Sequence, residues 1–208
     1  MKNHFTIQFG GLMAVLSGLF LASAHTIDLI IGGGDDTALG KAIVFIAHLL
    51  LVFGLVGLHE AQGNHNGWLG SIGMILGVIG TIVVTAVVFV ETAAISGVNV
   101  ESVFQTGVNQ YIFTFGPLLF VIGMLLFGFS VLKNKVLSRL GGILLLIGTI
   151  VFSAGTLAGN AEAVITTIGA IFTGAGLIWL GLSLFKKMEK NNTVEGDGSE
   201  INTINQSN

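Results

Sequence analysis

The sequence predicts an all-α membrane protein, a polytopic bundle of six transmembrane helices with its N- and C-termini on the cytoplasmic side. Composition is the first observation, because 52% of the 208 residues are hydrophobic and only 9% are charged. Soluble domains carry roughly 25% charged residues, which face water. The second observation is that six apolar stretches are long enough to cross a bilayer, and the third is a segregation of basic residues between their connections.

The six spans follow from length and pattern. A helix needs about 20 residues to cross a hydrocarbon core about 30 Å thick, since each residue rises about 1.5 Å. The runs lack the alternation of a lipid-facing strand, so we expect helices. The predicted spans are residues 5–24, 39–58, 68–90, 112–132, 140–158 and 163–185. They form one domain, residues 1–189, and the polar tail 190–208 is expected to be disordered because it has no apolar face to bury.

The basic residues predict the orientation of the bundle. If the spans alternate in direction, seven of the eight basic residues fall on one side, namely Lys2, Lys133, Lys135, Arg139, Lys186, Lys187 and Lys190. The positive-inside rule makes that side cytoplasmic, and in a bacterial-type cell the membrane is then the plasma membrane. The connections on the opposite side hold Lys41 and the acidic residues Asp28, Asp35, Asp36, Glu91, Glu101 and Glu162.

The first apolar stretch has a second interpretation. Lys2 precedes it and Ala22-Ser23-Ala24 ends it, which is typical of a signal peptide with its cleavage site. Cleavage would remove the first span from the bundle. The apolar region of a signal peptide has roughly 7 to 15 residues, and this stretch is longer, which favours an uncleaved span.

Small residues in the spans predict how the helices pack. The chain contains 31 glycines, and small side chains let helix backbones approach closely inside a lipid bilayer. The predicted packing positions are Gly10, Gly18, Gly73, Gly77, Gly116, Gly123, Gly141, Gly148 and Gly155. Those of the fourth and fifth spans recur every seven residues, so we expect these two rows to face each other in an antiparallel hairpin. Chance clustering in a glycine-rich chain is the alternative.

The connections on the acidic side carry three further expectations. Asp35 or Asp36 is expected to cap the second helix after a glycine turn. Pro117, the only proline, is expected in the first turn of the fourth span, where its missing N–H breaks no hydrogen bond. The connection 92–111 has apolar residues at helical spacing, which predicts a short amphipathic helix on the surface or a lid over a cavity.

Ionisable side chains in the spans are candidates for a proton or ion path, because they are costly inside a membrane. His48 lies near the middle of the second span. Lys41 and His59 lie within roughly 20° of it around a helix that advances about 100° per residue, and Glu91 ends the third span. Histidine titrates near neutral pH and suits proton transfer. The structural alternative has Lys41 reaching outward, His59 in water, and neutral His48 bonded to a hydroxyl of another helix.

No pattern predicts catalysis, a metal site or a cofactor. The chain has no cysteine, which excludes thiolate ligands and cysteine nucleophiles. The basic groups are few and lie beside the membrane, so we expect no nucleic-acid partner. A calcium site at Asp28, Asp35 and Asp36 would lack the regular spacing of such ligands. Haem would need a second axial ligand facing His48 at mid-depth, and the other histidines lie near span ends or in a turn.

Three functions remain open from the sequence. The first is a non-enzymatic structural, accessory or regulatory bundle, whose partners are the lipid bilayer, a second copy or another membrane protein. The second is a small transporter or channel, with or without proton coupling, whose path runs near His48. The third is a haem-binding redox protein. A water-accessible cavity reaching His48 would favour transport, whereas a dry interior packed through glycines would favour the structural role.

Overall fold

The computed structural model describes the backbone of residues 4–205 and the side chains of residues 4–185. Over this range the chain is helical and contains no β-strand, which confirms the predicted all-α class. The long helices are α1 (His4–Ile30), α2 (Ala38–Gln62), α3 (Gly67–Ile95), α5 (Gly107–Asn134), α6 (Arg139–Gly155) and α7 (Glu162–Asn205). The short ones are η1 (Gly63–Asn66), α4 (Glu101–Gln105) and η2 (Gly159–Ala161).

The helices have the length and surface of a membrane protein. Within the described residues, four segments are long and apolar enough to cross a membrane: His4–Ile30, Ala38–Ile95, Gly107–Asn134 and Gly159–Phe185. The second of these contains both α2 and α3, and the shorter α6 is also apolar. Large apolar side chains also cover the outside of the bundle, among them Phe53, Ile75, Ile79, Ile147, Ile150, Ile171 and Leu182. A soluble monomer rarely exposes so much contiguous apolar surface.

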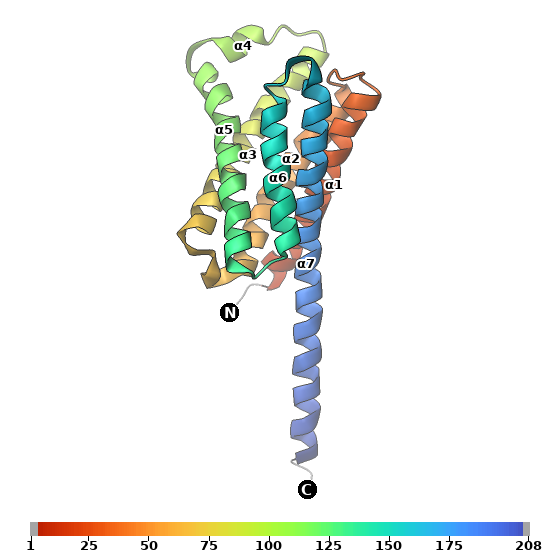
Figure 1. Cartoon of the computed structure of the whole chain (residues 1–208), viewed down its shortest axis with the longest axis vertical. Helices are drawn as coiled ribbons and strands as arrows, with labels where there is room; N and C mark the ends of the chain where they lie inside the picture. Colours follow the sequence, from red (N-terminus) through yellow and green to blue (C-terminus); the bar gives the residue numbers. More distant parts are fainter. Residues whose placement is uncertain (1–3, 206–208) are drawn as a thin grey trace.

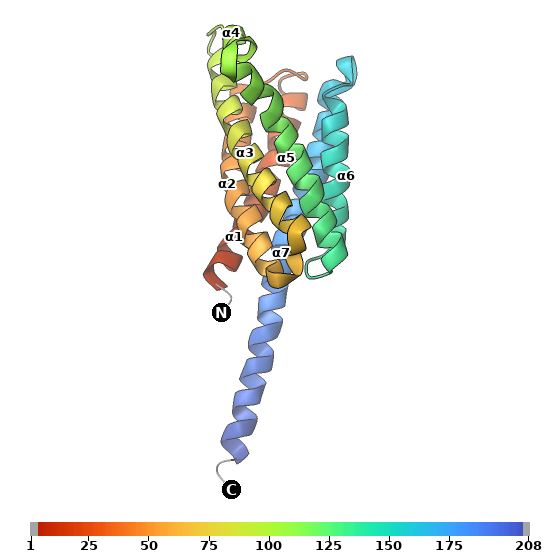
Figure 2. The same ribbon diagram turned by 90° about the vertical axis from the view of Figure 1, so that its left-hand side faces the viewer.

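The long helices form a closed ring in which neighbours along the chain are neighbours in space. They run along one common axis (Figures 1 and 2). α1 contacts α2 on one side and α7 on the other, so the last helix closes the ring against the first. We call the end with the α1–α2, α3–α5 and α6–α7 connections the acidic end, and the opposite end the basic end. At the basic end, Lys133 lies in the last turn of α5, Lys135 lies in the α5–α6 turn and Arg139 begins α6.

The last helix, α7, extends beyond the bundle, and the first helix, α1, is needed to complete it. α7 continues as a helix to Asn205 and extends past the bundle in Figure 1. The side chains of residues 186–208 lie outside the described range, so the expected disorder of 190–208 stays a prediction. Lys2, Lys186, Lys187 and Lys190 likewise lie outside it. At the N-terminal end, cleavage after Ala24 would remove most of α1. The ring would then lose the packing of α1 against both α2 and α7.

Glycines bring the backbones of neighbouring helices into contact. A Cβ on Gly10 of α1 would collide with the backbone of Gly57 on α2, and one on Gly18 would collide with Gly174 of α7. In α3, a Cβ on Gly73 would meet the backbone of Phe127 on α5. These seams run between α1 and α2, α1 and α7, α3 and α5, and α6 and α7.

The prediction that the glycine rows of the fourth and fifth spans face each other is wrong. Gly116 and Gly123 of α5 face α3, at Val83 and beside Gly77. The α6 row faces α7, where Gly141, Gly148 and Gly155 approach Leu180, Thr173 and Thr166.

The α5–α6 hairpin does form, but it packs through a different pair of glycines. A Cβ on Gly128 would meet Leu146, and one on Gly142 would meet Leu132 and Val131. The physical reason is that a short turn determines which helices are neighbours and leaves their rotation free. Each helix in a ring has two neighbours, and α3 and α7 offer the better matched rows of small residues.

Two local predictions are also wrong. The cap of α2 is Thr37 and not an aspartate, because its hydroxyl accepts a hydrogen bond of 2.9 Å from the N–H of Gly40. Asp28 instead holds the cap in place, since its Oδ1 accepts from the N–H and the hydroxyl of Thr37 at 2.9 and 2.7 Å. Pro117 lies inside α5 and not in its first turn, because residues 107–111 continue the helix toward the acidic end.

The apolar core occupies the half of the ring nearer the basic end. Its fully buried members on α2 are Leu51, Leu55 and Leu58, and α5 adds Met124, Phe127 and Val131. α7 contributes Leu177, Leu180 and Leu184. Nearer the acidic end there are two smaller clusters, built around Leu21 with Ala47 and Ala24 with Val44. The acidic half is therefore less filled, and this is where a cavity lies.

Candidate functional site

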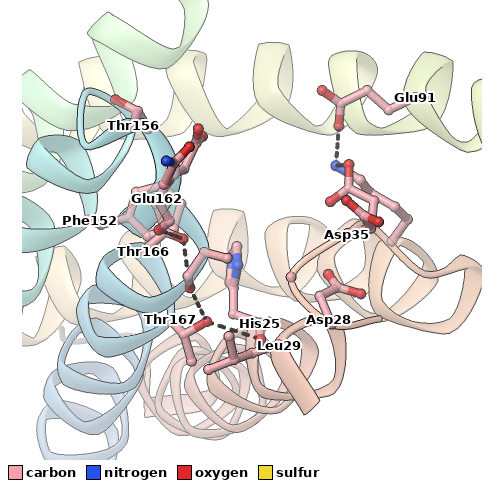
Figure 3. Close-up of a pocket in the computed structure, with 17 residues that line it drawn as sticks. His25, Asp28, Leu29, Asp35, Glu91, Phe152, Thr156, Glu162, Thr166 and Thr167 are labelled. Atoms are coloured by element: carbon pink, nitrogen blue, oxygen red, sulfur yellow. Dashed lines mark hydrogen bonds and ion pairs between the residues drawn. The ribbon is translucent and has the colours of Figure 1, made fainter. Parts of the chain in front are cut away.

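A polar cavity of about 590 Å³, here called the vestibule, lies at the acidic end between the α1–α2 side and the α6–α7 side of the ring (Figure 3). Five carboxylates line it, from Asp28, Asp35, Asp36, Glu91 and Glu162. Lys41 is the one lysine among the lining residues, which leaves an excess of four negative charges. The potential inside the vestibule therefore favours cations, because low-dielectric walls focus the field of the charges that line a cleft.

A second compartment of about 560 Å³, here called the inner pocket, lies deeper between α1, α2, α3, α5, α6 and α7. Its lining is mainly apolar and includes Leu21, Val44, Val84, Val87, Val88, Phe113, Leu118, Phe120 and Val121. Eight residues line both compartments: His25, Asp28, Asp36, Lys41, Glu91, Phe152, Thr156 and Glu162. The vestibule and the inner pocket therefore adjoin and form one cavity with a charged part and an apolar part.

Lys41 lies at the boundary between the two compartments and forms ion pairs with two of the carboxylates that line them. Its Nζ lies 2.6 Å from Oε2 of Glu91 and 2.9 Å from Oδ2 of Asp36, and its side chain is 13% exposed. Figure 3 shows the hydrogen bond between Glu91 of α3 and this lysine of α2 as a dashed line. The ammonium group therefore links α2, α3 and the α1–α2 connection, and it forms these ion pairs at the acidic end, the direction in which the structural alternative has Lys41 reach.

His48 lies at the inner pocket with one ring nitrogen unused. Its Nδ1 is 2.9 Å from the backbone carbonyl of Val44. Because a carbonyl only accepts, Nδ1 carries the proton and Nε2 is an acceptor. No described residue bonds Nε2, although the side chain is only 6% exposed and its ring lies 5.6 Å from that of Phe120. The hydroxyl partner of the structural alternative is thus replaced by a carbonyl of the same helix.

The predicted path residues separate into two groups. Lys41, Glu91 and His48 all line the inner pocket. His59 lies near the basic end, where its Nε2 is 3.2 Å from Oγ of Ser71, and it lines neither compartment. Buried leucines of the core lie between His48 and His59 along α2. The cavity therefore connects the acidic end with His48 and stops there.

His25 is a site residue that sequence reasoning missed, and Asp28 was considered there only as a calcium ligand. The ring of His25 packs edge-on at 5.2 Å against Phe152 of α6, and its backbone carbonyl accepts a hydrogen bond from Thr167 of α7. Asp28 is only 8% exposed. Residues three apart share a helix face, so the spacing of His25 and Asp28 was a usable signal for one polar face of α1.

Two more residues of the inner pocket carry a polar atom that lacks its usual partner. Thr173 is 4% exposed, and its Oγ1 has no hydrogen-bond partner among the described residues. On α5, Pro117 has no N–H to donate to the carbonyl of Phe113, four residues earlier. All three residues line the pocket. The apolar wall of the pocket is therefore interrupted by residues that carry polar groups.

The other sequence alternatives for chemistry gain nothing from the geometry. Within the described residues, no group of three or more histidine and acidic side chains is arranged to hold a metal ion, and this includes Asp28, Asp35 and Asp36. The short helix expected in the connection 92–111 does form as α4, but its residues line neither compartment. The haem alternative stays a prediction, and a Soret absorption band in the purified protein is its test.

Comparison with known proteins adds no family to this description. The chain matches no protein-family model, no curated protein and no solved structure. The function proposed below therefore rests on the cavity and its residues.

Proposed function

We propose that the chain crosses a bacterial-type plasma membrane six times, with both ends in the cytoplasm and the acidic end facing outward. The ring of long helices supports this, because successive helices run in opposite directions along one axis. Lys133, Lys135 and Arg139 at the basic end support the orientation, since basic residues stay on the cytoplasmic side.

The short α6 is the least obvious span. Its 17 residues cover about 26 Å, slightly less than a hydrocarbon core of about 30 Å. A mismatch of this size is met by local thinning of the bilayer at modest cost. Close packing of α6 along α7 supports a span rather than a surface helix.

Within this topology the chain is a small, non-enzymatic transporter that binds a solute entering from the outer side. The observation that carries the proposal is the cavity, because it leads from the acidic end to His48 near the middle of α2. The filled half near the basic end closes the route to the cytoplasm, as in an outward-facing state. The free Nε2 of His48 is the group that would exchange a proton during transport.

Accessibility of single cysteines tests both the topology and the cavity. The chain has no native cysteine, so one introduced thiol is the only one. We expect a membrane-impermeant thiol reagent outside the cell to label Asp35→Cys at the vestibule and Ser153→Cys in the inner pocket. Lys135→Cys should react only after the membrane is opened, and Leu55→Cys in the core should not react in the folded protein. Outside labelling of Lys135→Cys, or no labelling of Ser153→Cys, would contradict the proposal.

Flux measurements test the role of His48. The native chain and His48→Ala are reconstituted in liposomes that contain a pH-sensitive dye, with His59→Ala as a matched control outside the cavity. We expect a proton flux that accompanies solute uptake in the native chain and in the control, and its loss in His48→Ala. Equal fluxes in all three preparations would remove His48 from the transport path.

A structural or accessory role is the second candidate. The glycine seams favour it, because they hold the helices in direct backbone contact as a rigid scaffold requires. In this role the cavity has no ligand. Substitutions of residues in its lining would then alter neither binding nor flux.

A further inference from the structure

We propose that the cavity binds an amphiphilic organic cation, with its positive head in the vestibule and its hydrocarbon body in the inner pocket. This inference rests on the proposed function, since it names the class of solute for the same cavity. Its basis is the juxtaposition of an excess of carboxylates with an apolar compartment that ends at the buried His48, whose Nε2 has no partner among the described residues.

The charges of the vestibule are not balanced within the protein. Lys41 pairs with Glu91 and Asp36, and these are the ion pairs found among the described side chains. Asp28 is more than nine-tenths buried, and its carboxylate receives hydrogen bonds only from Thr37, which is neutral. Buried carboxylates are costly unless a cation compensates them. A positive group that enters the vestibule would supply this compensation.

The inner pocket selects the rest of the ligand. Its volume of about 560 Å³ falls in the range of roughly 300–1,000 Å³ found for small-molecule sites. Valine, leucine and phenylalanine side chains dominate its lining. Phe152 lines both compartments and presents a ring at the boundary. Aromatic rings attract organic cations, so this boundary suits a positive group attached to an apolar body.

The deepest polar atom indicates what the body of the ligand can carry. Nε2 of His48 accepts a hydrogen bond, because the Nδ1–H bonds the carbonyl of Val44. The His48 side chain is more than nine-tenths buried, lines the inner pocket and leaves Nε2 without a partner among the described residues. A hydroxyl or amide on the body would donate to Nε2. A carboxylate would not, because it can only accept and Nε2 of neutral His48 offers no donor.

The wall of the inner pocket also includes side chains on the outer surface of the ring. Phe113 and Leu118 of α5 line the pocket and are 39% and 49% exposed. The same chemistry can therefore arrive from two sources: a hydrophobic cation from water, through the vestibule, or an aminolipid from the bilayer, past α5.

A matched pair of ions tests the charge preference. Tetraphenylphosphonium and tetraphenylborate have the same shape and opposite charge. Their binding to the full chain in nanodiscs of choline lipids is measured in excess of protein-free nanodiscs. We expect saturable binding of the cation that is at least about tenfold tighter than that of the anion, the ratio set by one favourable charge contact. Equal binding of the two ions, or tighter binding of the anion, would overturn the proposal.

Charge variants give effects of opposite sign. Glu162→Gln removes a vestibule carboxylate that makes no ion pair, and we expect tetraphenylphosphonium to bind about threefold to tenfold more weakly. Lys41→Gln removes the competing ammonium group, and binding should strengthen. Glu101→Gln at the same end lies outside the cavity and should leave binding unchanged. Weaker binding in Lys41→Gln would contradict the proposal, provided that this variant elutes as a folded monodisperse protein.

Filling the inner pocket separates it from the vestibule. Val84→Phe places a ring in the pocket and should abolish binding, whereas Ile82→Phe on the exposed face of the same helix should not. Unchanged binding in Val84→Phe would contradict the placement of the apolar body. Both variants are first checked for native elution from a sizing column.

The source of the ligand is resolved by adding an aminolipid to the nanodiscs. Competition with tetraphenylphosphonium identifies the bilayer as a source, and its absence identifies water; both results retain the cationic class.

Failure of this proposal is distinguishable from failure of the transport proposal. If Ser153→Cys is labelled from outside while tetraphenylphosphonium does not bind, the cavity stands and the cationic class is wrong.

Discussion

The two halves of the ring are built from the same helices, but one half has a filled apolar interior and the other contains a cavity. Near the basic end, leucine, methionine and phenylalanine side chains such as Leu55, Met124 and Phe127 fill the space between the helices completely. Near the acidic end the corresponding inward positions hold smaller side chains such as Val44, Val84 and Thr173. Glycine seams join α1 to α2, α1 to α7, α3 to α5 and α6 to α7, but α5 and α6 meet through Gly128 and Gly142 near the basic end and diverge toward the acidic end (Figures 1 and 2). The cavity therefore reflects both smaller side chains and the separation of α5 from α6.

Polar groups also differ between the halves. Near the basic end, Ser130 and Asn134 of α5 donate to the carbonyl of Asn66, and the amide of Asn66 donates to carbonyls of His59 and Gly63. These bonds tie α5 to the α2–α3 connection. This end also holds buried polar atoms without a partner among the described residues, on Gln62 and Asn66, but these two residues line neither compartment. Near the acidic end, the unpartnered Nε2 of His48 and the carboxylate of Glu162 belong to residues that line the cavity, so a ligand can reach them.

The largest effect is expected where a side chain is forced into a seam of the filled half. Gly73→Val would push a branched side chain into the backbone of Phe127. We expect a loss of about 3 kcal/mol in the free energy of unfolding, the upper part of the usual cost of overpacking. The measurement is denaturant titration in detergent followed by circular dichroism. Ala86→Val on the exposed face of α3 is the matched control and should unfold like the native chain.

A smaller effect compares the two interiors directly. Leu55→Ala in the filled half leaves a void and should cost about 2–3 kcal/mol of unfolding free energy, the lower part of the usual range for this substitution. Val121→Ala beside the inner pocket should cost about 1 kcal/mol or less, because this side chain already borders empty space. The same titration measures both. Equal losses in the two variants would mean that the halves are packed alike and that the contrast drawn above is wrong.

The smallest effect concerns the cap that Asp28 and Thr37 form at the rim of the vestibule. Thr37→Val removes the hydroxyl that bonds both Gly40 and Asp28, and we expect a loss of about 1–2 kcal/mol in the free energy of unfolding. Thr37→Ser keeps the hydroxyl and should restore most of it. If the serine variant is as unstable as the valine variant, the hydrogen bonds are not the cause.

Much of the fold was predictable because apolar length and charge are local signals. Each predicted span falls on a long helix, and the ionisable residues Lys41, His48 and Glu91 were predicted together and do share a cavity. Helical periodicity placed Lys41 and His48 on one face of α2, and Glu91 was a candidate because it ends the third span.

The errors arose where the answer depends on rotation or on distant contacts. Periodicity cannot tell which neighbour a row of small residues faces, so Gly123 and Gly148 were paired with each other and not with α3 and α7. Asp28 looked like a residue of an open connection, because its bond partner Thr37 lies nine positions away. Pro117 was misplaced because the helix boundary was set one and a half turns too late.

The closure of the ring by α1 and α7 has a consequence for assembly. Proteins are synthesised from the N-terminus, so α1 must wait for the last helix before Gly18 meets Gly174. Until then one side of α1 lacks its protein neighbour, and the vestibule lacks the wall that carries Glu162 and Thr166. A chain that ends before α7 would therefore have neither a complete ring nor a ligand site. It would also expose the surface of α1 that packs against α7 in the complete protein.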